Sequence, residues 1–534
     1  MSHTEFDFIV VGAGSAGCAV ASRLSEAGQY TVALVEAGGR DLYPWIHIPI
    51  GYFRTMGNPN TDWCYETEHD TGLNGRSIKW PRGKVLGGSS SINGLLYVRG
   101  QDEDFNHWAQ LGNKGWSWDD VLPYFRKAEH WEGSDHDDRG KGGPLNVSEN
   151  QVERDVVGAW IDAAVAAGYP RNNDYNSGDQ EGVGHFQMTM KNGRRCSSAV
   201  AYLKPARNRK NLEIFTHCMT LGLLTEGKTV KGIKARHKGH DIEIRARREV
   251  ILSAGAIGSP QILMTSGIGD PDDLKHHGIT MVHQLDGVGK NLQDHLQARP
   301  VYKCTSGSIN TDSRNPIKLV GMALEYALRR TGPMAMAASL GTAFLKTDPA
   351  LDRPDIQFHI QPFSADSPAE GAHRFSAFTA SVLQLRPEST GHIELTSASM
   401  QDYPKIYPNY LATQTDCDTL VKGIKITRKI CNTDPVKSMI TEEFKPGPAV
   451  DDDDDDAILD WARSNSTTIY HPTGTCKMGQ DTMAVVDERL RVRGMSGLRV
   501  ADASIMPVIT SGNTNAPAIM IGEKTAAMIL EDAS

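Results

Sequence analysis

The sequence predicts an α/β protein of two parts: a domain of parallel strands that is discontinuous along the chain, and an α+β domain built on an antiparallel sheet. Three observations support this. The N-terminal segment alternates short apolar strands with a helix, as parallel sheets do. Residues 300–450 carry alternating apolar and polar segments, which favour antiparallel strands. Residues 498–530 return to the strand-then-helix order of the N-terminus.

The N-terminal unit has the order of a Rossmann-like domain. Residues 8–11 form a short β-branched apolar run, typical of a buried parallel strand, and residues 31–35 form a second one. Between them lie the turn Gly12-x-Gly14-x-x-Gly17 and a helical stretch. Gly12 allows the tight turn, Gly14 leaves room for a pyrophosphate, and Gly17 lets the helix approach the sheet.

Glu36 ends the second strand, 24 residues after Gly12. A carboxylate at this place can accept hydrogen bonds from both ribose hydroxyls of an adenosine, and it would repel a 2′-phosphate. Because strand, glycines, helix, second strand and terminal acid occur in the right order, we predict a dinucleotide site. These residues alone leave the choice between NAD and FAD open.

The size and composition of the chain limit the classes of protein to which it can belong. Its 534 residues are too many for one ordinary core, so two or more domains are expected. An apolar content of 39% and a charged content of 23% suit a soluble globular protein. The formal net charge of −9 gives no general case for binding nucleic acid or anionic membranes.

The sequence carries no signal for export, membrane insertion or metal binding. The eight cysteines are scattered without a CxxC pair, so we interpret them as reduced thiols. The first strand begins by residue 6 and no stretch of ~18 apolar residues is uninterrupted, so we expect no signal peptide, no transmembrane segment and a cytoplasmic location. The aspartates 451–456 lack the spacing of a calcium loop and precede a helix, whose N-terminus favours carboxylates.

Two further turns are rich in small residues. Residues 83–94 form a glycine-serine segment whose backbone N–H groups can approach a ligand closely, although the segment alone is equally consistent with a plain loop. Residues 211–252 alternate as strands and end in Ser253-Ala254-Gly255, where a strand delivers small residues to a turn before a helix.

Two polar side chains from distant turns are candidates for chemistry. His471 precedes Pro472, which biases its backbone toward an extended or turn conformation. Asn515 lies at the entry of the last helix. For any one of the 18 histidines a structural role is the default. An imidazole with a pKa near neutrality nevertheless suits removal of a hydroxyl proton, and a side-chain amide can hold an alcohol oxygen.

Four motifs together resemble the glucose–methanol–choline (GMC) flavoprotein oxidoreductases, in the choline and alkanol dehydrogenase branch. They are the glycine turn 12–17 with Glu36, the segments 83–93 and 255–269, and residues 471–475 followed by 502–517. The resemblance implies FAD rather than NAD, with a substrate domain over the flavin. It also implies that His471 and Asn515 meet in front of the flavin N5, where the protein positions the alcohol C–H.

The resemblance also divides the chain. It implies an FAD-binding domain in residues 1–155, 194–297 and 466–534, and a substrate-binding domain in residues 156–193 and 298–465. The residues expected to bind FAD are Gly12, Gly14, Ser15, Ala16, Glu36, Ala37, Arg82, Val85, Gly87, Gly88, Asn93, Gly94, Ala254, Gly255, Tyr470, Asp502, Ala503, Asn515 and Pro517.

Two departures from the family pattern refine these expectations. Some members attach FAD covalently through a histidine at the position of Ile92, so we predict non-covalent FAD. Residues 332–341, which correspond to the cage for a quaternary ammonium, contain no carboxylate and are rich in methionine, which favours an aliphatic or ether-type alcohol. We expect Met334 and Met336 either in this pocket or in the core. His359 and Phe363 are expected on the pocket floor.

The resulting hypothesis is FAD-dependent oxidation of a primary alcohol to the aldehyde, with His471 as base and a quinone, protein or dye as electron acceptor. An alcohol oxidase that uses O2, a redox-idle flavoprotein lyase, a light-driven fatty-acid decarboxylase and a non-enzymatic FAD-binding protein are the alternatives. The decarboxylase should not need the pair of His471 and Asn515. The sequence does not fix the alcohol, the physiological acceptor or the oligomeric state.

Overall fold

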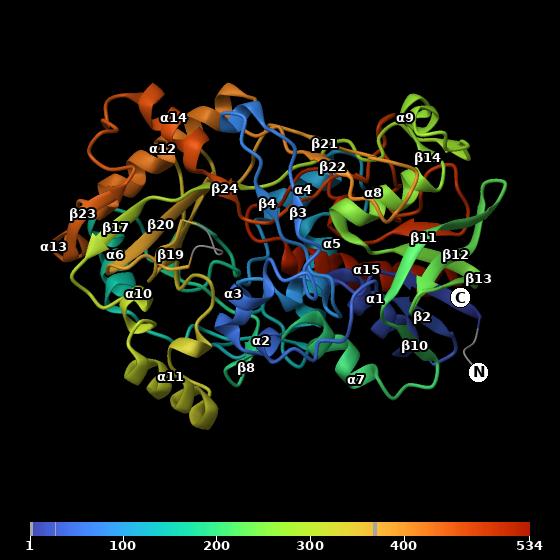
Figure 1. The fold of residues 1–534 in the computed structure, drawn as a ribbon, viewed down its shortest axis with the longest axis horizontal. Helices are drawn as coiled ribbons and strands as arrows, with labels where there is room; N and C mark the ends of the chain where they lie inside the picture. The colour runs from blue at the N-terminus through green and yellow to red at the C-terminus, as the bar shows by residue number, and fades with distance from the viewer. Residues whose placement is uncertain (1–3, 27, 367–370, 534) are drawn as a thin grey trace.

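The computed structural model describes residues 4–26, 28–366 and 371–533. Figure 1 shows two parts side by side, each built around its own large sheet. One part contains the two ends of the chain, and the other contains most of the residues between 300 and 465. The α/β class and the antiparallel second part are therefore as predicted.

The first sheet is parallel in its centre and antiparallel at one side. Its order is β10-β2-β1-β13-β12-β11, and β25 pairs with β13. The pairs β10–β2, β2–β1, β1–β13 and β13–β25 are parallel, whereas β12 is antiparallel to both of its neighbours. The strands are β1 (Glu5–Val11), β2 (Val32–Val35), β10 (Leu212–Phe215), β11 (Cys218–Glu226), β12 (Thr229–His237), β13 (His240–Leu252) and β25 (Leu498–Val500).

Helices from the two ends of the chain pack against each other. They are α1 (Ser15–Glu26) and α15 (Asn515–Ala533), which lie side by side in Figure 1. Gly522 permits this approach, because a Cβ atom there would lie 2.5 Å from the carbonyl oxygen of Ala16. The C-terminal segment thus completes the N-terminal part, as its α/β character predicts.

The second sheet is antiparallel throughout. Its order is β23-β17-β20-β19-β18-β7, and β16 pairs with both β20 and β24. The helices α6 (Asp155–Ala166) and α12 (Gln414–Cys431) pack on it. The strands are β7 (Gly182–His185), β16 (Leu296–Ala298), β17 (Val301–Cys304), β18 (Gly341–Leu345), β19 (Ile356–Gln361), β20 (Ala377–Gln384), β23 (Ile440–Lys445) and β24 (Thr467–Thr468).

Two strands of this sheet lie at the edges of the expected domains. Residues 296–297 of β16 and residues 467–468 of β24 fall in ranges assigned to the cofactor domain, yet both strands pair within the antiparallel sheet. The domain bounds stay a prediction. The buried apolar side chains form one cluster that spans both parts, so the two sheets share a continuous core.

Shorter elements surround the two sheets. The remaining helices that matter below are α2 (Pro44–His47), α3 (Tyr52–Thr55), α5 (Trp118–Ala128), α8 (Gly255–Thr265), α10 (Ile309–Asp312), α11 (Pro316–Arg329), α14 (Asp455–Asn465) and the 3-10 turns η3 (Gly88–Ser91), η5 (Pro333–Ala335) and η6 (Ala503–Ile505). Asp454 caps α14 by accepting from the N–H of Ala457 at 2.9 Å, so the aspartate run enters a helix as expected.

The described residues bear on three features that the sequence analysis did not expect: a transmembrane helix, a metal site and disulfide bonds. None of the helices there combines the length and apolar character needed to cross a membrane. The described His, Cys, Asp and Glu side chains form no group that could hold a metal ion. All eight cysteines are free, and only Cys64 is exposed.

Candidate active site

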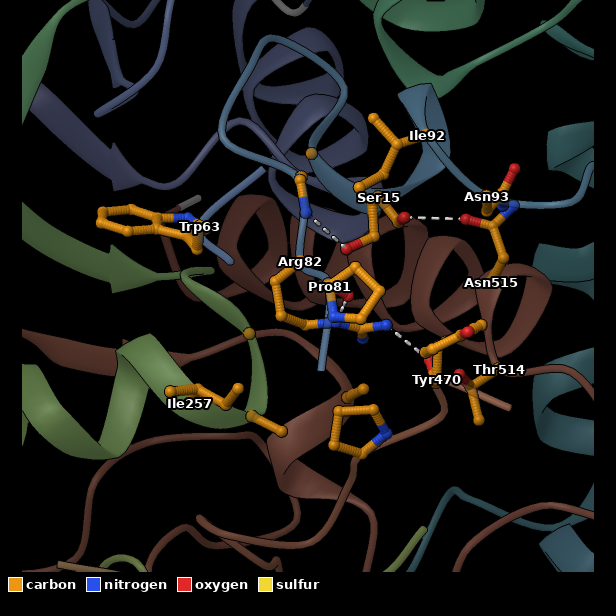
Figure 2. A pocket seen from close by; sticks show the side chains of 18 of the residues that line it. Ser15, Trp63, Pro81, Arg82, Ile92, Asn93, Ile257, Tyr470, Thr514 and Asn515 are labelled. Atoms are coloured by element: carbon orange, nitrogen blue, oxygen red, sulfur yellow. Dashed lines mark hydrogen bonds between the residues drawn. The ribbon is translucent and has the colours of Figure 1, made fainter. Parts of the chain in front are cut away.

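A cavity extends from the glycine turn of the first sheet to the inner face of the second. At the nucleotide end it is lined by the β1–α1 turn and the end of β2, and at the far end by β16 and β19. Figure 2 shows its middle part, where side chains from Ser15, Asn93, Tyr470 and Asn515 converge from different segments. Such a long, continuous path suits a dinucleotide, whose two ends need separate sites.

The glycine turn is shaped for a close backbone approach. Gly12 has φ +99°, and a Cβ there would lie 2.4 Å from the carbonyl oxygen of Ser253. Gly14 instead faces open space, since its Cβ would meet no protein atom nearer than 3.8 Å. The turn therefore leaves a cradle at Gly14 that a phosphate group can enter, at the N-terminus of α1.

Glu36 is held at the end of β2 by backbone donors. Its carboxylate accepts from the N–H groups of Ala13 at 2.9 Å and Gly38 at 2.8 Å. Burial raises the pKa of Glu36 to about 7, against the effect of these two hydrogen bonds. The side chain lines the cavity, where its oxygens can also accept from a ribose.

The glycine-serine segment packs directly on the glycine turn. A Cβ at Gly88 would lie 2.6 Å from Cα of Gly14, so the two loops touch backbone to backbone. Asn93 and Gly94 follow in the cavity wall, and the Ile92 side chain lies there too (Figure 2). This segment is therefore a part of the site rather than a remote loop.

Asp502 holds in place the turn before α8, whose residues Ala254 and Gly255 line the cavity. Its Oδ2 accepts from Gly255 N–H at 2.9 Å and from Ser259 Oγ at 2.6 Å, while Oδ1 accepts from Ser504 N–H at 2.8 Å. Burial raises the pKa of this carboxyl above its usual value. The end of β25 is thereby tied to the start of α8.

Most residues expected at the cofactor line this cavity. The exceptions are Val85, Gly87 and Pro517, which are absent from its wall. Gly87 instead donates its N–H to the carbonyl of Ala13 at 2.8 Å, and Val85 bridges to Gly39. The residues found in the wall are Gly12, Gly14, Ser15, Ala16, Glu36, Ala37, Arg82, Gly88, Asn93, Gly94, Ala254, Gly255, Tyr470, Asp502, Ala503 and Asn515.

His471 is positioned by its backbone. Asp294 accepts from the N–H of His471 at 2.7 Å and from Thr468 Oγ1 at 2.6 Å. Arg82 Nη2 donates to the carbonyl of Tyr470 at 2.6 Å, a contact drawn in Figure 2. Tyr470 has φ +72°, a left-handed conformation that costs energy for a bulky residue and persists only where its surroundings fix it.

The side chain of His471 belongs to a chain of hydrogen bonds with one direction. His295 Nε2 lies 2.8 Å from the carbonyl oxygen of Leu385, which can only accept, so this nitrogen carries the proton. His295 Nδ1 is then an acceptor, 3.0 Å from His471 Nδ1, which must donate. The neutral His471 therefore has its lone pair on Nε2.

That lone pair faces an asparagine. Asn513 Nδ2 donates to His471 Nε2 at 3.0 Å, and Gln357 Nε2 donates to Asn513 Oδ1 at 3.3 Å. The second contact fixes the orientation of the Asn513 amide, with its NH2 group toward the imidazole. His471 and Asn513 both line the cavity.

The expected pairing of His471 with Asn515 is therefore wrong in this structure. Asn515 begins α15, and its Oδ1 accepts from Ser15 Oγ at 2.7 Å (Figure 2). Asn513 lies in the loop before the helix and reaches His471. Because the two asparagines are only two residues apart, the sequence did not show which one faces His471. The point at which α15 begins determines which asparagine faces His471, because Asn515 lies in the helix and Asn513 in the loop before it.

Burial keeps the three histidines around this point neutral. It lowers the pKa of His295 to about 4 and of His359 to about 3. It lowers the pKa of His471 well below the usual value, and His295, His359 and Arg82 lower it further. The neutral imidazole can accept a proton at Nε2, whose lone pair accepts from Asn513 in this structure. Its pKa lies below the near-neutral value expected from the sequence.

The far end of the cavity is formed by the antiparallel sheet. His359 and Phe363 line it, as expected. Met336 is fully buried elsewhere and Met334 packs against the core, and neither lines the cavity, so the core alternative for the two methionines holds. Ala338, Ser339, Gln297, Arg299 and Gln361 are found in the wall instead.

The supporting residues Asp294, His295 and Gln357 have no signal in the sequence. Asp294 and His295 lie in a short polar segment before β16, and Gln357 lies in β19, all far from residue 471 in the sequence. The pairing of β16 with β24, extended by hydrogen bonds between Gln293 and Thr473, brings His295 beside His471. The register of this non-local pair is what identifies Asp294 and His295, while Gln357 is placed by the pairing of β19 with its neighbours.

Comparisons with known proteins agree with this architecture. Two family models described as GMC oxidoreductase match residues 6–297 and 387–522. The chain is 42% identical to the mitochondrial choline dehydrogenase of Homo sapiens, over 99% of this chain and 90% of that protein. It is 41% identical to an alcohol dehydrogenase (acceptor) of Pseudomonas putida, over 98% of this chain and 96% of that protein.

A similar solved structure is a formate oxidase of Aspergillus oryzae in which FAD modification was studied. It superposes with a TM-score of 0.91 and 28% identity, and the match covers 100% of this chain and 99% of that one.

Proposed function

The chain belongs to the GMC oxidoreductase family of FAD flavoproteins, and from this premise we propose that it oxidises a primary alcohol to the aldehyde with His471 as general base. The observation that carries the proposal is the one-way hydrogen-bond chain ending at His471 Nε2. It leaves this nitrogen unprotonated, in a cavity wall, at neutral pH.

The chain's own residues account for the proton half of the reaction. An alcohol hydroxyl beside His471 transfers its proton to Nε2, while the Nδ1–H stays with His295. The Asn513 amide, which donates to Nε2 in this structure, would donate to the alcohol oxygen once the hydroxyl takes its place at Nε2. When bound, FAD supplies the hydride acceptor. The cradle of Gly12, Gly14 and Glu36 would hold its adenosine and pyrophosphate.

We propose that the cofactor is bound without a covalent link. The support is Ile92, whose aliphatic side chain lies in the cavity wall and has no nucleophilic atom. Acid precipitation of the purified yellow protein should release the colour into the supernatant. Colour that stays with the pellet would contradict non-covalent binding.

The proposed substrate is an uncharged aliphatic or ether-type alcohol. The only carboxylates in the cavity wall, among the described residues, are Glu36 and Asp502, both at the nucleotide end. At the substrate end Arg299 lines the wall, and its polar contact is with Gln361 Oε1 at 3.4 Å. This half-buried cation forms no ion pair with a carboxylate among the described residues, so it would repel a quaternary ammonium group. The aromatic rings of Tyr52, Phe53 and Phe363 in the same wall suit an uncharged apolar chain.

An alcohol panel tests the function directly. Purified protein is mixed anaerobically with 1-butanol, an ether alcohol and choline, and bleaching of the flavin absorbance is followed. We expect the neutral alcohols to bleach the flavin and choline to be slower. Absence of bleaching by any alcohol would support the redox-idle lyase instead.

The electron acceptor is proposed to be a quinone or protein rather than O2. Dye reduction and peroxide formation are measured in parallel, and peroxide equal to the alcohol consumed would identify an oxidase. His471→Ala should lower the rate of flavin reduction ~10²-fold or more. A cytoplasmic location also remains a proposal, to be checked by cell fractionation.

A further inference from the structure

Helix α11 presents an apolar face to solvent. Among the described residues thirteen large apolar side chains are exposed, and five of them belong to this one helix. Ile317, Val320, Leu324 and Leu328 are 83%, 60%, 57% and 82% exposed. Their spacing of three or four residues places them on one side of the helix as a continuous stripe. Isolated exposed apolar residues are ordinary, but such a concentration marks an interaction surface.

The opposite side attaches the helix to the protein. Tyr326 is buried, and its hydroxyl donates to the carbonyl of Gly193 at 3.0 Å. Asn315 caps the first turn by accepting from the N–H groups of Ile317 and Lys318. The helix is therefore well formed and held by one face. Figure 1 shows it at the periphery of the molecule, projecting away from both sheets.

The charges around this helix are opposite to those of the whole protein. Residues 314–330 carry four basic side chains and one acidic side chain, whereas the whole chain has a formal net charge of −9. Lys318 pairs with Asp312 at 2.7 Å, but Asp312 is also paired with Arg154, so this cluster retains a positive charge. Arg329 and Arg330 are both exposed at the C-terminal end.

We propose that α11 docks this protein on an anionic lipid bilayer, with the stripe of Ile317, Val320, Leu324 and Leu328 in the interface and the basic residues at the headgroups. An amphipathic helix with an apolar face and flanking Lys and Arg is the element that lies in a membrane surface without crossing it. Basic residues add attraction to anionic lipids. This local feature outweighs the acidic character of the whole chain, because charges beyond about 8–10 Å are screened at physiological salt.

Docking through this face would bring the active-site cavity near the bilayer. After α11 the chain forms η5, which packs on both α11 and the 3-10 turn of residues 49–51, and then reaches Ala338 and Ser339 in the cavity wall. The helix is thus only nine residues from the substrate end of the site. A lipid-soluble alcohol or acceptor could then exchange between the bilayer and the cavity.

Vesicle flotation with the purified holoenzyme tests the proposal. Wild type is mixed with vesicles of phosphatidylcholine alone or with added phosphatidylglycerol, and the protein that floats with the lipid is measured. The test variant is Ile317→Glu/Leu328→Glu, because these highly exposed side chains can change without disturbing the fold. Leu42→Glu/Met281→Glu, at exposed apolar residues outside α11, is the matched control.

We expect wild type and the control to float with anionic vesicles, less with neutral ones, and less at high salt. The test variant should bind anionic vesicles ~10-fold or more weakly, because it lacks two apolar side chains that wild type buries in the membrane interface. Equal flotation of wild type and test variant would overturn the proposal, as would no binding to anionic vesicles. Analytical sedimentation tests whether a second copy of the chain covers this face instead. If wild type is a dimer and the test variant is a monomer, the face is a dimer interface and the membrane proposal is overturned.

Discussion

At the scale of single residues, the direction of each hydrogen bond determines what His471 can do. A backbone carbonyl cannot donate, so the contact of His295 with Leu385 fixes the tautomer of both histidines. Gln357 in turn fixes the Asn513 amide. Among the described residues no carboxylate contacts the His471 side chain, because Asp294 accepts from the backbone N–H of His471 instead.

Asn513, rather than Asn515, should govern the rate of flavin reduction. Asn513→Ala removes the donor to His471 Nε2 and is expected to lower that rate ~10²-fold, by analogy with the loss of one oxyanion donor. Anaerobic stopped-flow at saturating alcohol measures it. Asn515→Ala, which loses the contact with Ser15, is the matched variant and should alter FAD retention more than rate. The reverse ranking would reject the assignment of Asn513.

His359 should make stability depend on pH. Its folded pKa of about 3 lies below the ordinary value, so at intermediate pH the unfolded chain binds a proton that the folded chain does not. The contribution is fully present above pH ~6.5 and is lost as pH falls toward the folded pKa. The stability advantage of wild type over His359→Gln should shrink by ~3 kcal/mol between pH ~6.5 and ~4.

Urea unfolding of both proteins at several pH values measures this difference. His240→Gln, at an exposed histidine, serves as the control and should run parallel to wild type. If the stability of His359→Gln also runs parallel to that of wild type across this pH range, the imidazole of His359 is not kept neutral by burial in the folded protein.

At the scale of elements, local order could be predicted and non-local pairing could not. The β1–turn–α1–β2 unit with Glu36 is encoded within the first part of the chain, so its chemistry follows from the sequence. The antiparallel sheet follows from period-two alternation. His295 reaches His471 only through the pairing of β16 with β24, which joins segments 170 residues apart or more. The start of α15, two residues after Asn513, separates the two asparagines.

Two glycines of the first turn should respond differently to the same substitution. Gly17→Ala places a Cβ 2.0 Å from the carbonyl oxygen of Gly12, so the apoprotein should lose ~1–3 kcal/mol of stability. Gly14→Ala meets no protein atom nearer than 3.8 Å and should leave the apoprotein unchanged. It narrows the cradle, however, and should weaken FAD binding ~10-fold.

Thermal unfolding of the apoproteins and titration with FAD separate the two effects. Wild-type FAD affinity in Gly14→Ala would show that the cofactor does not pass over this turn.

At the scale of the whole molecule, the two ends of the chain are joined by an ion pair whose carboxylate is fully buried and whose guanidinium is half-buried. Glu523 of α15 is fully buried and accepts from Arg23 Nε of α1 at 2.8 Å and from the Tyr202 hydroxyl at 2.8 Å. Lys127 of α5 approaches the same carboxylate at 3.5 Å. The carboxylate therefore links the helix that starts the nucleotide site to the helix that follows Asn513.

Removing this carboxylate should destabilise the entire protein. Glu523→Ala leaves the buried Tyr202 hydroxyl without its acceptor and the half-buried Arg23 guanidinium with Glu26 alone, so we expect a loss of ~2–4 kcal/mol. Urea unfolding followed by tryptophan fluorescence measures the loss. Glu531→Ala, which removes an exposed partner of Arg489, should change stability by less than ~1 kcal/mol.

The same change should reach the active site, because α15 begins two residues after Asn513 and its first residue contacts Ser15 of the nucleotide turn. We therefore expect Glu523→Ala to release FAD at lower urea than wild type, together with the loss of tertiary structure. If Glu523→Ala unfolds like Glu531→Ala, the contact between the two terminal helices is not held by this ion pair, and apolar packing around Gly522 is sufficient.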